Sequence, residues 1–216
     1  KANSTLPDFS KIKNVKQKKQ QFFDYLIPMA KKANQKVMQK RKLLLKLENK
    51  SILSNQETNF INKLSIIYKV KQNTAKNRIN GLLIKVDLIP TSLLLAQAAN
   101  ESSWGTSRFA KLGNNLFGQW CYNKNCGIVP NQRSKGKTHE VRKFNSAYES
   151  IEAYQYNLNH NQSYNSLRLI RASLRKKHKK ITGTALAQGL ILYSERGQSY
   201  VNDIIKMIKS NNLEKN

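Results

Sequence analysis

A nearly uninterrupted apolar run at residues 93–99 (LLLAQAA) constrains the fold more than any other feature of the 216-residue chain. Pro90, with Thr91 or Ser92, opens the helix that contains this run, because proline suits the first turn of a helix. A helix that is apolar on nearly every face is buried in the centre of a domain. We therefore expect a domain built around this helix.

Other apolar patterns predict further helices around it. A stripe spaced by three and four residues, starting at Phe22 and Leu26, predicts a helix to about Asn49, with a kink or a local start at Pro28. Further helices are predicted over 55–69, 73–85, 147–159, 165–177, 183–193 and 199–210. Ser146 with Glu149 forms a capping-box pattern at the start of the helix over 147–159.

Residues 105–137 differ from the rest of the chain and are rich in glycine, which indicates loops and turns. The short segments 115–120 and 138–144 contain aromatic and β-branched residues, and we expect them to pair as a β-hairpin around 121–126. The predicted fold class is α+β and mostly α-helical. Residues 1–20 are predicted as a basic flexible tail, 21–85 as a basic helical N-terminal arm packed on the domain, and 86–212 as the main domain.

The charge of the chain is strongly positive, at +27. Such a charge attracts polyanions at long range, and nucleic acid, anionic membrane and acidic cell-wall polymer are the candidates. Lysine outnumbers arginine, which favours diffuse attraction over sequence-specific nucleic-acid recognition. A solvated lysine-rich surface without a partner is the alternative.

No apolar stretch is long enough for a membrane span. The chain opens at Lys1, so we expect any signal segment to lie outside it.

The two cysteines, Cys121 and Cys126, lie close together in the sequence CYNKNCG. They favour a short-loop disulfide in an oxidising compartment, and two free thiols in a cytosolic protein are the alternative. The three histidines are scattered, and no second Cys or His pair completes a tetrahedral metal site. We expect neither a metal nor another cofactor.

Acidic residues are scarce, which draws attention to Glu101 at the end of the apolar helix, followed by Ser102-Ser103-Trp104-Gly105. A carboxyl in this position, beside an indole, is expected to lose hydration, which favours its protonated form. A carboxyl that keeps its proton near neutral pH can act as a general acid. The alternative is that Glu101 caps the helix or forms a surface ion pair.

The segment 96–109 (AQAANESSWGTSRF) resembles the helix-end motif of the glucosaminidase family of peptidoglycan hydrolases. The segment 114–118 (NNLFG) is similar to the next motif of that family, on the floor of the substrate cleft. Further segments resemble the Bax-like branch of this family in Gram-negative bacteria, namely 22–28 (FFDYLIP), 118–121 (GQWC) and 193–197 (YSERG). The likeness covers about residues 20–210.

The resemblance implies a lysozyme-like domain with a small β-hairpin lobe beside a sugar-binding groove. It implies an endo-β-N-acetylglucosaminidase that cleaves the β-1,4 bond after N-acetylglucosamine in peptidoglycan glycan strands. Glu101 matches the catalytic acid of the family, and Glu140 more weakly matches a second acidic residue on the β-lobe. Substrate contacts are expected from side chains near the motifs, namely Trp104, Phe117, Gln119, Tyr164 and Tyr200. Core packing is the alternative for Trp104, Phe117 and Tyr200.

Two carboxyls across an oxocarbenium-like transition state are common in glycoside hydrolysis. The sequence leaves inverting, retaining and 2-acetamido-assisted routes open, and the last would reduce the demand on Glu140. A lytic transglycosylase, which needs one acid and leaves an anhydro sugar, is the main alternative. A nonenzymatic polyanion-binding protein is the second. We expect a monomer in the periplasm or outside the cell, loosely attracted to an anionic wall or membrane surface and without a specific nucleic-acid partner.

Overall fold

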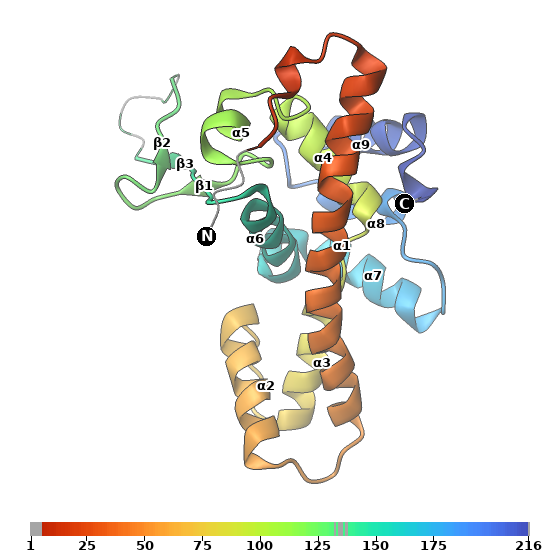
Figure 1. Ribbon diagram of the computed structural model, residues 1–216. Helices are drawn as coiled ribbons and strands as arrows, with labels where there is room; N and C mark the ends of the chain where they lie inside the picture. Colours follow the sequence, from red (N-terminus) through yellow and green to blue (C-terminus); the bar gives the residue numbers. More distant parts are fainter. Residues whose placement is uncertain (1–5, 132, 134–135, 137, 216) are drawn as a thin grey trace.

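A computed structural model describes residues 6–131, 133, 136 and 138–215. The fold is α+β and mostly helical, as predicted (Figure 1). Its longer helices are α1 (Val15–Glu48), α2 (Asn55–Tyr68), α3 (Ala75–Lys85), α4 (Thr91–Ser102), α6 (Ala147–His160), α7 (Asn165–Lys176) and α9 (Gln198–Ser210). Shorter ones are α5 (Arg108–Gly113), α8 (Gly183–Ala187), η1 (Phe9–Lys11), η2 (Gln162–Tyr164), η3 (Gln188–Leu190) and η4 (Leu213–Lys215).

A small antiparallel sheet forms what we call the β-lobe, residues 119–144. Its strands are β1 (Trp120–Cys121), β2 (Gly127–Ile128) and β3 (Glu140–Arg142), in the order β1-β3-β2. Trp120 pairs with Val141 on one edge of β3, and Ile128 pairs with Val141 on the other. The predicted pairing of segments 115–120 and 138–144 is therefore present as β1 and β3, and β2 pairs with the other edge of β3. A Cβ on Gly127 would lie 2.0 Å from the Val141 carbonyl oxygen, so β2 needs glycine there.

The core consists of two clusters of buried side chains that share helix α1. The larger cluster gathers α4 and the helices around it, and it takes Phe22, Leu26 and Ala30 from the first half of α1. The smaller cluster contains Val37 and Leu44 from the second half of α1 together with side chains of α2 and α3. In Figure 1, α2, α3 and this second half of α1 project from the rest of the molecule. The boundary between arm and main domain at residue 86 stays a prediction.

Helix α4 occupies the centre of the larger cluster, as its apolar sequence predicts. Every residue from Ser92 to Ala99 is buried, including the polar Gln97. Helices α1, α8 and α9 pack around α4. Burial on all sides means that the residues at the end of this helix are held by the whole domain rather than by one neighbour.

The N-terminal segment differs from the predicted flexible tail of residues 1–20, of which 1–5 lie outside the described residues. Phe9 is buried at 1% exposure against Phe22, and α1 begins at Val15 rather than at Phe22. Asn14 caps α1 by accepting a hydrogen bond from the Gln17 N–H. Residues 6–20 thus contain one buried ring and the capped start of α1, and the flexibility of this segment stays a prediction.

Helix α1 runs without interruption through Pro28, where a kink or a local start was predicted. Pro28 is exposed, so the carbonyl that loses its helical partner can be solvated by water. The helix predicted over 183–193 is shorter than expected and ends in η3, whereas α5 lies in a region predicted as loops.

A buried ion cluster joins distant helices. Asp87, 1% exposed, accepts hydrogen bonds from Arg175 Nε and Nη2 at 3.0 and 2.8 Å, and Arg41 Nη1 lies 3.4 Å from its carboxylate. Arg171 is also buried beside it, and burial lowers the pKa of Arg171 to about 10. These contacts join α1 to α7 across the start of α4.

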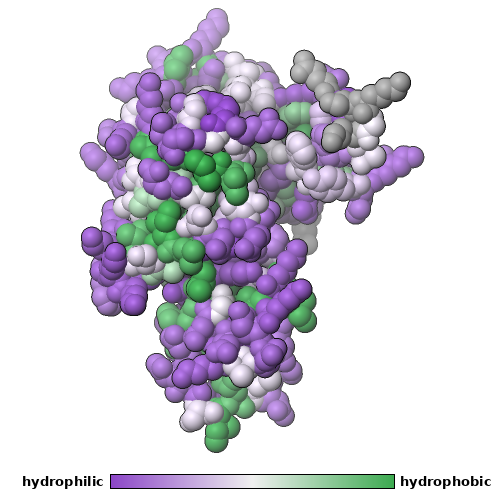
Figure 2. Space-filling model, turned by 180° about the vertical axis from the view of Figure 1, so that it is seen from behind, coloured by the Kyte–Doolittle hydropathy of each residue, from purple (hydrophilic) through white to green (hydrophobic). Residues whose placement is uncertain are grey.

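The surface reflects the high positive charge. Figure 2 shows hydrophilic side chains over most of one face, with hydrophobic side chains in separate groups between them. Within the described residues, no helix combines the length and the apolar content that a membrane span requires.

Candidate active site

Helix α4 ends in an unusual turn directly after Glu101. Ser103, Trp104 and Gly105 all have positive φ, at 50°, 61° and 75°. Only glycine adopts this region without cost, and each of the other two residues is disfavoured by about 1–2 kcal/mol. Ser102 secures the turn, because its hydroxyl donates to the Ala98 carbonyl at 2.6 Å and accepts from the Gly105 N–H at 2.8 Å.

Glu101 is half-buried at this helix end and is held on one side by a hydrogen-bond chain. The Tyr200 hydroxyl of α9 donates to Glu101 Oε1 at 2.8 Å, and Asn100 Nδ2 donates to the same oxygen at 3.2 Å. Gln97 Nε2 donates to the Tyr200 hydroxyl at 2.8 Å, and the Tyr154 hydroxyl donates to Gln97 Oε1 at 2.5 Å. Glu101 Oε2 accepts no hydrogen bond from the described residues, so one oxygen of the carboxyl is held and the other stays available.

Four tyrosines near Glu101 keep their protons to unusually high pH. Burial raises the pKa of Tyr200, Tyr193, Tyr154 and Tyr164 above the ordinary value, and the charge of Glu101 raises each pKa further. Because these phenols stay neutral, the Tyr200 and Tyr154 hydroxyls remain donors in the chain that ends at Glu101. The site is thus an acidic group surrounded by neutral hydrogen-bond donors.

Two of these tyrosines extend the site away from α4. Tyr193 stacks on Tyr200 with ring centroids 5.3 Å apart, and the ring centroid of Tyr164 lies 5.8 Å from that of Tyr193. Tyr193 is half-buried, whereas Tyr164 and Tyr200 are buried. The structure therefore brings the predicted residues Glu101, Tyr164 and Tyr200 together, and Tyr193 neighbours both of these tyrosines.

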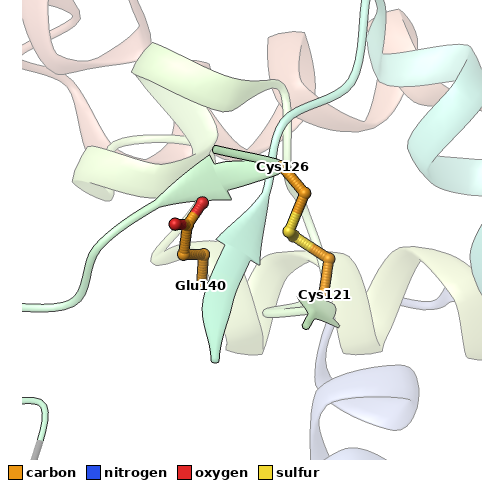
Figure 3. A group of neighbouring side chains, drawn as sticks. All are labelled: Cys121, Cys126 and Glu140. Carbon is orange, nitrogen blue, oxygen red and sulfur yellow. A yellow bond between two sulfur atoms is a disulfide. The ribbon is translucent and has the colours of Figure 1, made fainter. Parts of the chain in front are cut away.

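The second predicted carboxyl, Glu140, has a different environment in the β-lobe. It is buried, and its two oxygens accept hydrogen bonds from the Asn125 N–H at 3.1 Å and the Gly127 N–H at 2.8 Å. Cys121 and Cys126 form the expected disulfide beside it (Figure 3). Their sulfurs and a Glu140 oxygen lie within 4.8 Å of one another, but sulfurs joined in a disulfide offer no thiolate to a metal. The Glu140 carboxylate thus stabilises the loop closed by the disulfide through two backbone hydrogen bonds.

The other predicted contact residues lie in packed positions. Phe117 is buried and stacks on Tyr154 at 4.0 Å, and Trp104 packs edge-on against Phe22 and Phe23 with Lys19 above its ring. The Gln119 side chain accepts from the Ser150 hydroxyl at 3.3 Å. Substrate contact by Trp104, Phe117 or Gln119 stays a prediction, and the ring contacts of Trp104 and Phe117 support core packing for these two.

The β-lobe carries an exposed aromatic surface. Trp120 is 56% exposed and stacks on His139 with ring centroids 4.1 Å apart, and Tyr122 is also exposed. Trp120 lies on β1, and Tyr122 follows directly after the end of this strand. Exposed rings of this kind can stack on the C–H faces of sugars.

Three residues of the site were not predicted from the sequence, namely Gln97, Tyr154 and Tyr193. Gln97 precedes Glu101 by four residues, which places both on one face of α4, and it is the only polar residue in the run over 93–99. A single polar residue in an apolar run was the sequence signal that could have identified Gln97 as part of the site. Tyr154 and Tyr193 lie on segments far from α4 in the chain, and only the fold brings them together.

Comparisons with known proteins identify the family. The family described as mannosyl-glycoprotein endo-beta-N-acetylglucosaminidase, named Glucosaminidase, matches residues 76–213. Protein bax of Escherichia coli (strain K12) is 36% identical over 211 residues, which cover 97% of this chain and 75% of that protein. No solved structure matches the chain. The match extends over the whole described site, and the chain is therefore a Bax-like member of the glucosaminidase family.

Proposed function

We propose that this chain hydrolyses the β-1,4 bond after N-acetylglucosamine in peptidoglycan glycan strands, with Glu101 as the general acid. The observation that carries the proposal is the asymmetric environment of Glu101. Tyr200 and Asn100 hold Oε1, whereas Oε2 accepts no hydrogen bond from the described residues. A carboxyl held in this way keeps one oxygen free to carry a proton to a departing sugar oxygen.

The chain's own residues divide the work in this reaction. Glu101 protonates the glycosidic oxygen, and Tyr200 fixes the orientation of the carboxyl through its hydrogen bond. Gln97 and Tyr154 fix Tyr200 in turn. The exposed Trp120 and Tyr122 give the β-lobe apolar surfaces on which a glycan strand can stack.

Glu140 is the weaker candidate for a direct part in the chemistry. Both of its oxygens accept backbone N–H groups of the disulfide loop, which supports a role in shaping the β-lobe. A route in which the 2-acetamido group of the substrate attacks the anomeric carbon needs no second protein carboxylate as the nucleophile. This route fits a site with one available acid.

The test is the variant Glu101→Gln, assayed on purified sacculi. A general acid contributes about 10²–10⁴ in rate, so lysis should fall by at least about a hundredfold while the unfolding temperature stays close to that of the wild type. Glu48→Gln is a matched control, because Glu48 lies at the far end of α1, outside the family match. Near-wild-type activity of Glu101→Gln would contradict the proposal.

A lytic transglycosylase is the second candidate, and the contacts of Glu140 are the observation that favours it, because that reaction needs one acid. Mass analysis of the digested glycan distinguishes the two activities. Reducing N-acetylglucosamine ends support the hydrolase, and anhydro-muramic ends support the transglycosylase. A nonenzymatic polyanion-binding protein would release neither product.

We further propose that the protein acts in the periplasm or outside the cell. The Cys121–Cys126 disulfide supports this location, because disulfides persist in oxidising compartments. Glycan strands of peptidoglycan are the proposed partner, and the protein is proposed to act as a monomer.

A further inference from the structure

A surface cavity of about 550 Å³ lies between α2, the segment 69–72 and the start of α3. Its lining contains three cations, Lys69, Lys71 and Arg78, and no acidic residue. Among the described residues, none of these cations forms an ion pair with a carboxylate. All lining residues except Arg78 precede the stretch matched by the family. The cavity therefore lies in the part of the molecule formed by α2, α3 and the second half of α1, which we call the projecting part.

Two residues that line this cavity each carry a buried donor without a partner in the described structure. Ser65 is 7% exposed and its hydroxyl forms no hydrogen bond, and neither does Nε of Arg78. The Arg78 guanidinium is oriented by Asn62 Oδ1 and by the Asn73 carbonyl oxygen at 3.5 Å. Buried donors without acceptors are costly, so an acceptor-rich ligand would stabilise them.

The wall of the cavity is closely built. A Cβ on Gly81 of α3 would lie 3.0 Å from Val70 Cγ1 and 3.1 Å from Gln72 Oε1. The glycine therefore allows the segment 70–72 to pack tightly against α3. Lys85 donates to the Tyr68 and Lys69 carbonyl oxygens at 2.7 and 3.2 Å, which satisfies the last carbonyls of α2 and adds another positive charge nearby.

An exposed apolar side chain stands at the edge of this positive cavity. Ile66 lines it and is 79% exposed, and the adjacent Ile67 is 38% exposed. A free anion would gain nothing from an exposed isoleucine. A lipid bilayer offers both partners, because phosphate groups lie directly above the acyl region that accepts an apolar side chain.

We propose that this cavity binds the phosphate of an anionic phospholipid headgroup, with Ile66 entering the membrane surface. Lys69, Lys71 and Arg78 supply the positive charge, and the unpaired Ser65 hydroxyl and Arg78 Nε donate once their side chains turn toward the ligand. The site attaches the projecting part of the molecule to the membrane, and it is independent of the proposed glycosidase activity at Glu101.

The first test measures the binding of the full chain to vesicles that contain phosphatidylglycerol and to vesicles of phosphatidylcholine alone. Wild-type protein should bind the first and not the second. Lys69→Gln/Lys71→Gln should weaken binding about 25-fold, at about fivefold per lysine beside an anionic surface. The control Lys63→Gln/Lys76→Gln removes the same charge from exposed positions of α2 and α3 outside the cavity, and should change affinity far less. Equal losses in the two variants would overturn the site.

The second test separates a membrane from a soluble anion. Ile66→Ser leaves the charge unchanged and should weaken vesicle binding severalfold, and millimolar glycerol phosphate should not displace the protein. Unchanged vesicle binding of Ile66→Ser, or displacement by glycerol phosphate, would overturn the proposal. Activity on sacculi should be the same for all these variants, so failure of this site and failure of the proposed activity are seen separately.

Discussion

The hydroxyl of Tyr200 donates a 2.8 Å hydrogen bond to Oε1 of Glu101, although the two residues lie on helices far apart in the chain. Tyr200 itself accepts from Gln97, so its proton is directed at the carboxylate rather than at any other acceptor. Burial raises the pKa of Tyr200, and the charge of Glu101 raises it further. The phenol therefore stays a donor at every pH at which the proposed activity can be assayed.

Tyr200→Phe should lower kcat by about ten- to a hundredfold, because a hydrogen bond to a charged group contributes about 1.5–3 kcal/mol. The KM for a soluble glycan should change little, since Tyr200 is a positioning residue that acts through Glu101. Tyr148→Phe is a matched control, because the Tyr148 hydroxyl forms a similar bond to Glu152 at 3.1 Å elsewhere on the molecule. An unchanged kcat for Tyr200→Phe would remove the hydrogen bond from the mechanism.

Glu140→Gln should act mainly on the β-lobe. The amide retains one oxygen but loses the charge that accepts from the Asn125 and Gly127 N–H groups, and such charged bonds are about twice as strong as neutral ones. Hydrogen exchange at these two amides should accelerate, and activity should fall together with this loss of order. Loss of activity with unchanged exchange would instead indicate a direct part for Glu140 in the chemistry.

Much of the fold follows from short-range patterns in the sequence. The periodicity of α2, α3, α6, α7 and α9 places their ends within a few residues of the observed ones, and Ser146 caps α6 as its pattern predicts. Helix α5 could not be predicted in this way, because six residues are too few to show a helical period. The Cys121–Cys126 disulfide follows from the spacing of the only two cysteines.

The candidate site was predictable only in part. Glu101 stands out through its position after an apolar run, but the partners that hold it come from α9 and α6. The residue type of Glu140 suggests a catalytic carboxyl. Its hydrogen bonds to backbone N–H groups depend on the shape of the disulfide loop, which the sequence does not show. Long-range pairings of this kind carry no periodic signal, so they emerge only once the helices are packed.

Stability should fall at alkaline pH through buried tyrosines. Burial raises the pKa of Tyr68 to about 12, from about 10 in an unfolded chain. The neutral phenol therefore stabilises the folded state fully below pH about 10, and this contribution, on the order of 2 kcal/mol, is lost as the pH rises to about 12. Urea unfolding at pH 8 and pH 11.5 measures the loss. Tyr68→Phe should reduce it, whereas Tyr122→Phe, at an exposed position, should not.

Phe9 connects the N-terminal segment to the turn that follows Glu101. Its Cδ2 would lie only 2.7 Å from a Cβ on Gly105, so the ring packs directly against the backbone of the turn. Phe9→Ala should cost about 3–5 kcal/mol of stability and lower kcat of the folded protein, because the turn loses the side chain packed against it. Asp8→Asn is the control, since it removes only the exposed ion pair with Lys111 at 3.0 Å and leaves the ring in place. Urea unfolding and kcat on sacculi, measured at a temperature where both variants are folded, test this expectation. A destabilised Phe9→Ala protein with wild-type kcat would mean that the segment supports the fold without positioning the acid.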